Sequence, residues 1–125
     1  MQQAVRKYLT ALEAGDAEKA ALLFTADGWV QSPFLGQVSV RDYVTKVAAA
    51  SSRAKLTVHD VLVSAEGNLR AVGYYLYEWW LKDGSTVSFE CADVFNFDPA
   101  TGRIASVVLV YDTHLVRGVV DKKYP

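Results

Sequence analysis

The chain has 125 residues, a length that suits one domain able to bury about two-thirds of its unfolded surface. Hydrophobic residues make up 51% of it and charged residues 22%, a composition that excludes an intrinsically disordered chain. Thirteen Lys and Arg against fourteen Asp and Glu leave a net charge of −1, so we expect no overall attraction to nucleic acid or anionic lipid. The three Trp, seven Tyr and five Phe are the feature that needs an explanation.

The sequence carries no sign of export or membrane insertion. The single cysteine, Cys91, cannot form an internal disulfide, so nothing indicates an oxidising compartment. The N-terminal segment 1–12 carries Arg6 and Lys7 in a helical pattern and lacks the apolar core of a signal peptide. The most apolar stretch, 71–81, is too short for a membrane span of about 20 residues. We therefore expect a cytoplasmic domain with no membrane or nucleic-acid partner.

The first fifty residues have the pattern of three helices. Apolar residues recur at helical spacing in 5–12, which predicts an amphipathic helix. Asp16 is a good N-cap for a second, short helix over 17–24. After a short strand at 29–32, Ser39 begins a capping box for a third helix that runs to about residue 50.

The remainder of the chain has the pattern of strands. The expected strands are 56–63, 69–82, 85–97 and 103–113, separated by turn residues. Helices followed by an antiparallel meander argue for an α+β domain with three N-terminal helices on one face of the sheet.

Asp83-Gly84 is a strong signal for a hairpin with a two-residue loop, and it predicts a register. Tyr74 would then lie opposite Asp93, and residues directly opposite each other point to the same side of the sheet. The expected pocket face carries Tyr74, Leu76, Glu78, Trp80, Val87, Phe89, Cys91, Asp93, Phe95 and Phe97. The expected face away from the helices carries the row Tyr75, Tyr77, Trp79 and Leu81.

Asp93 lies in an otherwise apolar row of side chains. A carboxylate left unpaired there is costly, and its pKa should rise toward that of the neutral acid. Two interpretations stay open: a structural Asp paired with a hydroxyl or solvated at a pocket mouth, or a tuned acid, base or ligand hydrogen-bond donor. Tyr8 falls on the core-facing stripe of the first helix, and a Tyr8–Asp93 pair would satisfy both polar groups in one contact.

Other candidate residues have weaker patterns. Glu78 is either a salt-bridge residue at the pocket rim or a second contact for an elongated ligand. His59 is either structural or a replacement base, and Cys91 is by default a buried, inert thiol. No His, Cys, Asp or Glu cluster has the spacing of metal ligands, so we expect neither a metal nor a cofactor.

Three segments carry a resemblance to ketosteroid isomerase: KYLTALEAGD at 7–16, VQSP at 30–33 and ADVFNF at 92–97. Over nearly its whole length the chain is similar to the NTF2-like superfamily, which includes the SnoaL-like domains. The resemblance implies a single domain over 1–125, in which a curved, mainly antiparallel sheet and the helices enclose a conical pocket. It also implies polyketide cyclase-like chemistry as a second possibility beside that of the isomerase.

In ketosteroid isomerase a Tyr and a protonated Asp hydrogen-bond a carbonyl oxygen that becomes an enolate. Tyr8 and Asp93 match those two positions. The general base of that family is an Asp directly before a Pro, and here this position is Ser32, a poor proton acceptor near neutral pH.

Together these observations predict a protein that binds a small, apolar, carbonyl-containing molecule and catalyses proton transfer of the isomerase, cyclase or dehydratase type. The alternative is a non-catalytic, dimeric ligand-binding or interaction module. Asp93 and Tyr8 are the predicted catalytic residues. The predicted substrate-binding residues are Ser32, Tyr43, Tyr74, Leu76, Glu78, Trp80, Phe89, Cys91, Phe95 and Tyr111. Members of the resembled family commonly dimerise through the outer sheet face, which predicts a homodimer through the row Tyr75, Tyr77 and Trp79.

Overall fold

The computed structural model describes residues 1–120, so 121–125 of the predicted domain lie outside the described part. Six strands form one sheet in the order β2-β1-β6-β5-β4-β3; the β1–β6 pairing is parallel and the others are antiparallel. The strands are β1 (Phe24–Ser32), β2 (Gly36–Ser39), β3 (Ser51–Val63), β4 (Arg70–Leu81), β5 (Thr86–Phe97) and β6 (Ile104–Val110). The helices are α1 (Gln2–Ala14), α2 (Ala17–Ala21), α3 (Val40–Ala50) and α4 (Arg117–Val120), with a 3-10 turn η1 (Thr113–Leu115) after β6.

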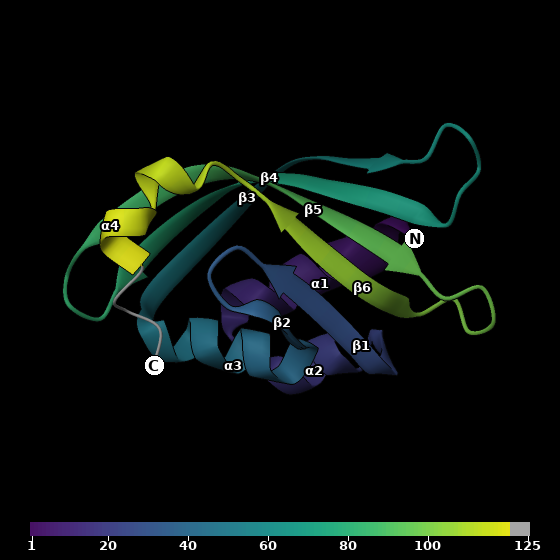
Figure 1. Cartoon of the computed structure of the whole chain (residues 1–125), viewed down its shortest axis with the longest axis horizontal. Coiled ribbons are helices and arrows are strands. Elements are labelled where there is room, and N and C mark those ends of the chain that lie inside the picture. Colours follow the sequence, from purple (N-terminus) through teal and green to yellow (C-terminus); the bar gives the residue numbers. More distant parts are fainter. Residues whose placement is uncertain (121–125) are drawn as a thin grey trace.

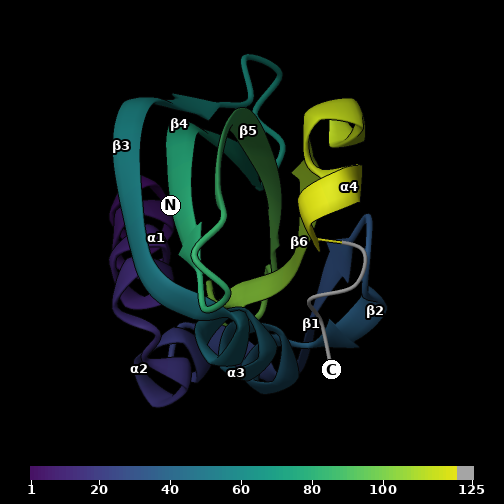
Figure 2. The same ribbon diagram turned by 90° about the vertical axis from the view of Figure 1, so that its left-hand side faces the viewer.

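The sheet curves over the three N-terminal helices, which cover its concave side (Figure 1). Seen from one end, β3, β4, β5 and β6 curl around an interior that α3 closes from below, while α1 lies at the side of β3 and α4 beside β6 (Figure 2). The predicted α+β cone, with three helices on a curved and mainly antiparallel sheet, is therefore confirmed.

Local signals end α1 and begin α2 and α3 as predicted. Gly15 ends α1 in the left-handed region, at φ 68°, which a glycine adopts without steric cost. The Asp16 carboxylate accepts a hydrogen bond from the Lys19 backbone N–H at 3.0 Å and so caps α2. The Ser39 hydroxyl accepts from the Asp42 N–H at 3.1 Å and caps α3.

Several element boundaries differ from the prediction, and β3 begins at Ser51 rather than at Leu56. Phe24 was expected on the second helix, but α2 ends at Ala21 and the buried Phe24 begins β1, where it pairs with Ile104. Strand β2 was not predicted; it pairs with the end of β1. The last strand ends at Val110 rather than at Thr113, because the Asp112 carboxylate accepts from the His114 N–H and starts a 3-10 turn.

The β4–β5 hairpin has a loop of three residues, 82–84, and not the predicted loop of two. Leu81 N–H donates to the Ser85 carbonyl at 2.9 Å, and Gly84 N–H donates back to the Leu81 carbonyl at 3.0 Å. Gly84 takes a φ of 90°, the positive value that closes a three-residue hairpin. Tyr75 therefore lies opposite Cys91, and Gly73 lies opposite Asp93.

This shift of one residue reverses the predicted faces of β4, because side chains alternate along a strand. Tyr75, Tyr77 and Trp79 are only 1%, 4% and 3% exposed and belong to the core. The aromatic row predicted to form a dimer face is thus the inner wall of the monomer. The residues predicted to line the pocket from β4, namely Tyr74, Leu76, Glu78 and Trp80, lie on the opposite, outer face of the strand.

Gly73 allows α1 to pack closely against the sheet beside Asp93. A Cβ at this position would lie 3.0 Å from Val5 Cγ1 and 3.3 Å from Leu9 Cδ1, closer than ordinary van der Waals contact. The helix that carries Tyr8 is therefore held against β4 next to the buried carboxylate.

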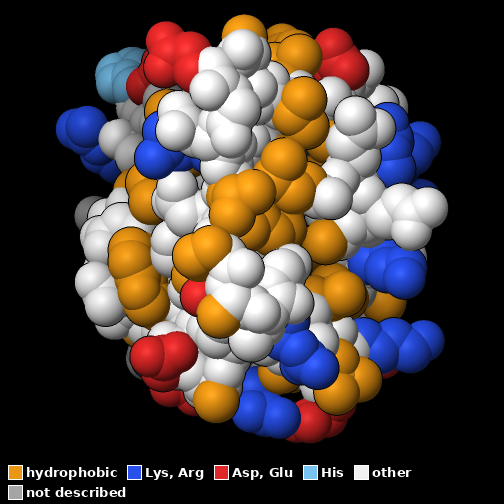
Figure 3. All heavy atoms as spheres, turned by 90° about the vertical axis from the view of Figure 1, so that its right-hand side faces the viewer, with side chains coloured by type: hydrophobic (Ala, Val, Ile, Leu, Met, Phe, Trp, Pro, Cys, Tyr) orange, Lys and Arg blue, Asp and Glu red, His pale blue; other side chains and the backbone are white. Residues whose placement is uncertain are grey.

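The end of the molecule with the N-terminus and loops 64–69 and 98–103 has hydrophobic side chains at its centre and charged ones around them (Figures 1 and 3). Exposed Met1, Val63 and Leu69 belong to the segments that meet at this end. Within residues 1–120, no helix has the length and apolar character needed to cross a bilayer.

Candidate functional site

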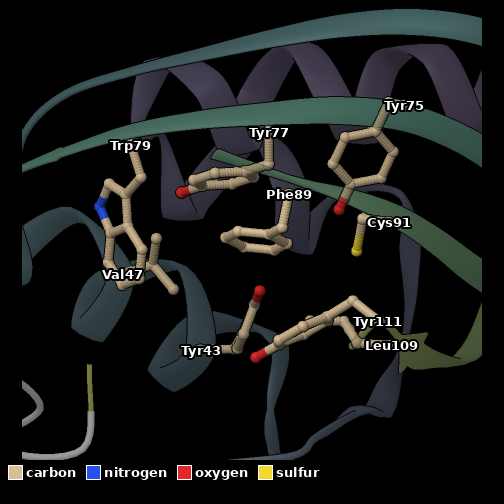
Figure 4. A pocket seen from close by; sticks show the side chains of 9 residues that line it. All are labelled: Tyr43, Val47, Tyr75, Tyr77, Trp79, Phe89, Cys91, Leu109 and Tyr111. Carbon is tan, nitrogen blue, oxygen red and sulfur yellow. The ribbon is translucent and has the colours of Figure 1, made fainter. Parts of the chain in front are cut away.

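A narrow cavity lies between α3 and the inner face of the sheet. Its wall is mostly aromatic (Figure 4) and consists of Tyr43, Val47, Tyr75, Tyr77, Trp79, Phe89, Cys91, Leu109 and Tyr111. Its volume is about 20 Å³, on a scale where one water molecule needs roughly 10–15 Å³. In this conformation the cavity therefore holds one or two water-sized molecules.

The cavity wall comes from alternate positions of neighbouring elements. Strand β4 contributes three aromatic residues at every second position, from Tyr75 to Trp79, and β5 contributes Phe89 and Cys91 in the same way. Tyr43 and Val47, which are four residues apart, lie on the face of α3 that points to the sheet. Each strand thus presents every second side chain to the cavity.

Asp93 lies directly behind this wall and is fully buried. The Tyr75 hydroxyl donates to its Oδ2 at 2.9 Å, and the Cys91 thiol donates to its Oδ1 at 3.2 Å. Burial raises the pKa of Asp93 to about 7, and the two hydrogen bonds from Cys91 and Tyr75 oppose this shift. The prediction of an Asp with a raised pKa among apolar side chains agrees with this arrangement.

Both donors to Asp93 are neutral at physiological pH. Burial, and next the Asp93 carboxylate, raises the pKa of the Cys91 thiol well above its usual range. The same two causes raise the pKa of the Tyr75 phenol. Cys91 therefore has little thiolate character and matches the inert, buried thiol expected for it.

Tyr8 is also fully buried, between the rings of Phe24 and Phe95 at centroid distances of 5.6 and 5.4 Å. Burial and then the nearby Asp93 carboxylate raise the pKa of its hydroxyl well above the usual value. That hydroxyl has no hydrogen-bond partner among residues 1–120. The predicted Tyr8–Asp93 hydrogen bond is wrong, because Tyr75, brought inside by the hairpin register, makes that bond instead.

The other predicted site residues fall into three groups. Tyr43, Phe89, Cys91 and Tyr111 line the cavity. Phe95 is buried against Tyr8 but is not part of the cavity wall. The third group lies on the outer face of the sheet and consists of Tyr74, Leu76, Glu78 and Trp80. There the Arg53 guanidinium covers the Trp80 ring, at 4.6 Å from its centroid.

Ser32 was predicted to contact substrate, but it does not line the cavity. It is buried at the end of β1, where its hydroxyl oxygen accepts from the N–H groups of Phe34 and Leu35, both at 3.3 Å. Ser32 therefore stabilises the turn before β2.

The sequence-based prediction missed five wall residues: Val47, Tyr75, Tyr77, Trp79 and Leu109. For the three on β4 the signal was present in the alternation, but it was assigned to the wrong side of the sheet. His59 lies on the outer face, where it pairs with Glu90 at 2.9 Å and packs on Tyr74. It is therefore not a base for this cavity. Within residues 1–120, no group of His, Cys, Asp and Glu side chains is arranged to hold a metal ion.

The raised pKa of Asp93 predicts that the protein loses stability as the pH rises. Between about pH 4 and pH 7 the folded protein keeps a proton on Asp93 that the unfolded chain has released, so the free energy of unfolding should fall by on the order of 4 kcal/mol. Urea denaturation at several pH values measures this slope, and Asp93→Asn should remove most of it. Equal stability of the wild type at pH 4.5 and pH 7.5, together with a carboxyl NMR titration near pH 4, would contradict the prediction.

Comparisons with known proteins agree with this architecture. The family of SnoaL-like domains matches residues 5–107. A protein with a ketosteroid isomerase-like fold from Catenulispora acidiphila, solved in complex with trimethylamine, superposes with a TM-score of 0.79 at 14% identity, over 93% of this chain and 90% of that one. TsrD from Streptomyces laurentii gives 0.76 at 17% identity, over 94% and 91%. An NTF2-like protein from Exiguobacterium gives 0.75 at 16% identity, over 87% and 98%.

The comparison with curated proteins gave no match. At these identities the solved structures show a common fold and nothing more. The match to the family covers most of the residues that build the helices, the sheet and the cavity wall. The chain therefore belongs to the SnoaL-like domain family, within the NTF2-like fold.

Proposed function

We propose that this protein binds a small, largely apolar carbonyl compound in its aromatic cavity and exchanges a proton with it through Asp93. The observation that carries this proposal is a fully buried carboxylate whose two hydrogen-bond donors, Tyr75 and Cys91, both line the cavity. An acid with a pKa of about 7 is present in both protonation states at neutral pH, where a general acid or base is most effective.

The protonation state of Asp93 would reach the cavity through Tyr75. Ionised Asp93 accepts the Tyr75 hydroxyl hydrogen. Neutral Asp93 can instead donate its own proton to the Tyr75 oxygen, and the Tyr75 hydrogen is then free to bind a carbonyl oxygen in the cavity. A neutral donor of this kind would stabilise the negative charge that develops on the carbonyl oxygen as an enolate forms.

Tyr8 is the second candidate donor. Tyr8 does not line the cavity, but its buried hydroxyl lies near Asp93 and Cys91 and has no partner in the described residues. A buried donor without an acceptor costs roughly 1–3 kcal/mol, which a ligand oxygen or a water molecule would recover.

The isomerase route needs a second carboxylate as base, and Ser32 stands at that position with its hydroxyl held by two backbone donors. Asp93 is a carboxylate in contact with two residues of the cavity wall, Tyr75 and Cys91. The proposed chemistry is therefore reversible enolisation. Asp93, acting through the Tyr75 hydroxyl, supplies the proton that the carbonyl oxygen takes up, and a solvent water accepts the proton that leaves the neighbouring carbon.

Deuterium uptake into acetone, the smallest ketone, tests the reaction. In D2O the protein should accelerate exchange of the acetone protons above the buffer rate, followed by proton NMR. Asp93→Asn should lower the protein-dependent rate by about 100-fold or more, since general acid–base catalysis contributes a factor of that size. Tyr75→Phe should also slow it, whereas Tyr74→Phe, the neighbouring tyrosine on the outer face, serves as the matched control. An Asp93→Asn protein that exchanges acetone at the wild-type rate would overturn the proposal.

A second candidate function is the binding of a small organic cation. Among residues 1–120 nine side chains line the wall, of which six are aromatic and none is Lys, Arg or His. The ion pairs found among residues 1–120 do not involve Asp93, so an ionised Asp93 has no positive partner there. Aromatic faces attract alkylammonium ions, and the similar protein from Catenulispora acidiphila was solved with trimethylamine.

The two candidates predict opposite pH dependence of binding. A ketone requires neutral Asp93, so acetone should bind more tightly below pH 7. Tetramethylammonium, a permanent cation, should bind more tightly above pH 7, where Asp93 is ionised. Each affinity should change by about three-fold per pH unit at the pKa, and by up to about ten-fold per unit where the form of Asp93 that does not bind prevails, as measured by NMR shifts of the Trp79 indole. An affinity for either probe that is independent of pH from 5.5 to 8.5 would exclude that candidate.

We also propose a homodimer, but through the face that the structure leaves outermost. Two apolar rows cross β4, β5 and β6 there: one is Val72, Val94 and Val108, and the other is Tyr74, Ala92 and Val110. Tyr74 is 40% and Val110 54% exposed, which is high for large apolar side chains. Analytical ultracentrifugation at micromolar concentration should give a dimer, and Val110→Glu should give a monomer with an unchanged circular dichroism spectrum. A wild-type protein that sediments as a monomer would contradict this proposal.

A further inference from the structure

The Phe89 ring occupies the centre of the cavity, between two other rings (Figure 4). It stacks on Tyr77 at a centroid distance of 5.3 Å and an interplanar angle of 14°. On its other side Tyr111 lies at 4.7 Å and 35°. Phe34 continues this column of rings beyond Tyr111, at 6.4 Å.

This column separates the two ends of the cavity. Trp79 and Val47 lie on one side of the Phe89 ring, and Tyr75 and Cys91 lie on the other (Figure 4). Asp93 is fully buried, and its two donors, Tyr75 and Cys91, belong to the second group. A molecule that enters beside Trp79 therefore meets Phe89 before it meets the Asp93 donors.

The remaining space does not admit a ligand larger than a few atoms while Phe89 stays in place. The cavity volume of about 20 Å³ corresponds to one or two water molecules. A binding pocket for a small organic molecule typically has several hundred Å³. Removal of the Phe89 side chain from the stack is the change that would join the two ends.

Phe89 is better suited to move than Tyr75 and Trp79, the rings at the two ends of the cavity. The Tyr75 hydroxyl is held by Asp93 and the Trp79 indole N–H by the Ser51 hydroxyl. The Phe89 side chain has no polar atom, and its exposed fraction of 9% is the largest among the buried wall residues. Only apolar and ring contacts hold it in the stack.

We propose that Phe89 is the plug of this pocket: its ring occupies the place of a ligand group between Tyr77 and Tyr111, and sets the size of molecule that reaches Asp93. The proposal rests on the cavity being the ligand site, as argued above, but access past Phe89 can be measured without any ligand. The sole cysteine of the chain, Cys91, lies on the inner side of the plug and reports on that access.

The experiment measures how fast methyl methanethiosulfonate modifies Cys91, by mass spectrometry at one fixed pH. The Cys91 thiolate attacks the reagent sulfur, forms a mixed disulfide and releases methanesulfinate. Compared with the wild type, Phe89→Leu should increase the rate by about ten-fold or more, and Phe89→Trp should decrease it. For each protein, the rate of Cys91 modification should not change when a low concentration of urea is added. A rate independent of urea shows that the reagent reaches Cys91 without global unfolding.

The matched control is Phe95→Leu, which shortens another buried ring on the same strand that is not part of the cavity wall. It should leave the rate of Cys91 modification within about two-fold of the wild type. The proposal that Phe89 is the plug would be overturned if Cys91 were modified equally fast in Phe89→Leu and in the wild type. It would also be overturned if Phe89→Leu and Phe95→Leu increased the rate equally. Neither result would bear on deuterium exchange into acetone, so the two proposals fail independently.

Discussion

The register of the β4–β5 hairpin determines which side chains this fold encloses. A loop of three residues, closed by Gly84 at positive φ, aligns Tyr75 with Cys91 on the inner face of the sheet. A loop one residue shorter would turn Glu78 inward, and would turn the hydroxyl that now donates to Asp93 toward solvent. The aromatic wall, the hydrogen bonds of the buried carboxylate and the apolar rows on the outside all depend on this single alignment.

The sequence contains local signals for much of the fold but little information about that alignment. Capping by Asp16 and Ser39 was predictable because donor and acceptor lie within three residues of each other. The inner face of β5 was also predictable, since Phe89, Cys91 and Phe95 alternate with more polar residues. In β4 both sets of alternate positions are largely apolar, so the alternation did not distinguish inside from outside. The choice then depended on whether Asp83-Gly84 closes a loop of two or three residues, which only the whole hairpin decides.

The same limit explains the errors at the site. Burial of Asp93 and Tyr8 follows from their own strand and helix, and both were placed in the core. Of the two donors to Asp93, Cys91 lies on the same strand, but the hydroxyl belongs to Tyr75 on β4, and the alternation along β5 alone does not indicate it. Ser32 differs from these two residues, because its local sequence predicts a structural role. A Ser before Pro33 can accept hydrogen bonds from the next N–H groups and so close a turn. A family position therefore did not predict a role in the cavity for this residue.

The interior contains more polar groups than a stable core requires, and this is the physical argument for a ligand. An Asp that must be desolvated, with a pKa raised to about 7, destabilises the folded protein at neutral pH. The Tyr8 hydroxyl, buried without a partner among residues 1–120, adds a second cost. Apolar residues of similar size at both positions would remove these costs, as they commonly do for buried polar groups. Buried polar groups that lower stability in this way are often functional. Here Asp93 and Tyr8 lie close to an aromatic cavity, and the ring of Phe89 separates the two ends of that cavity.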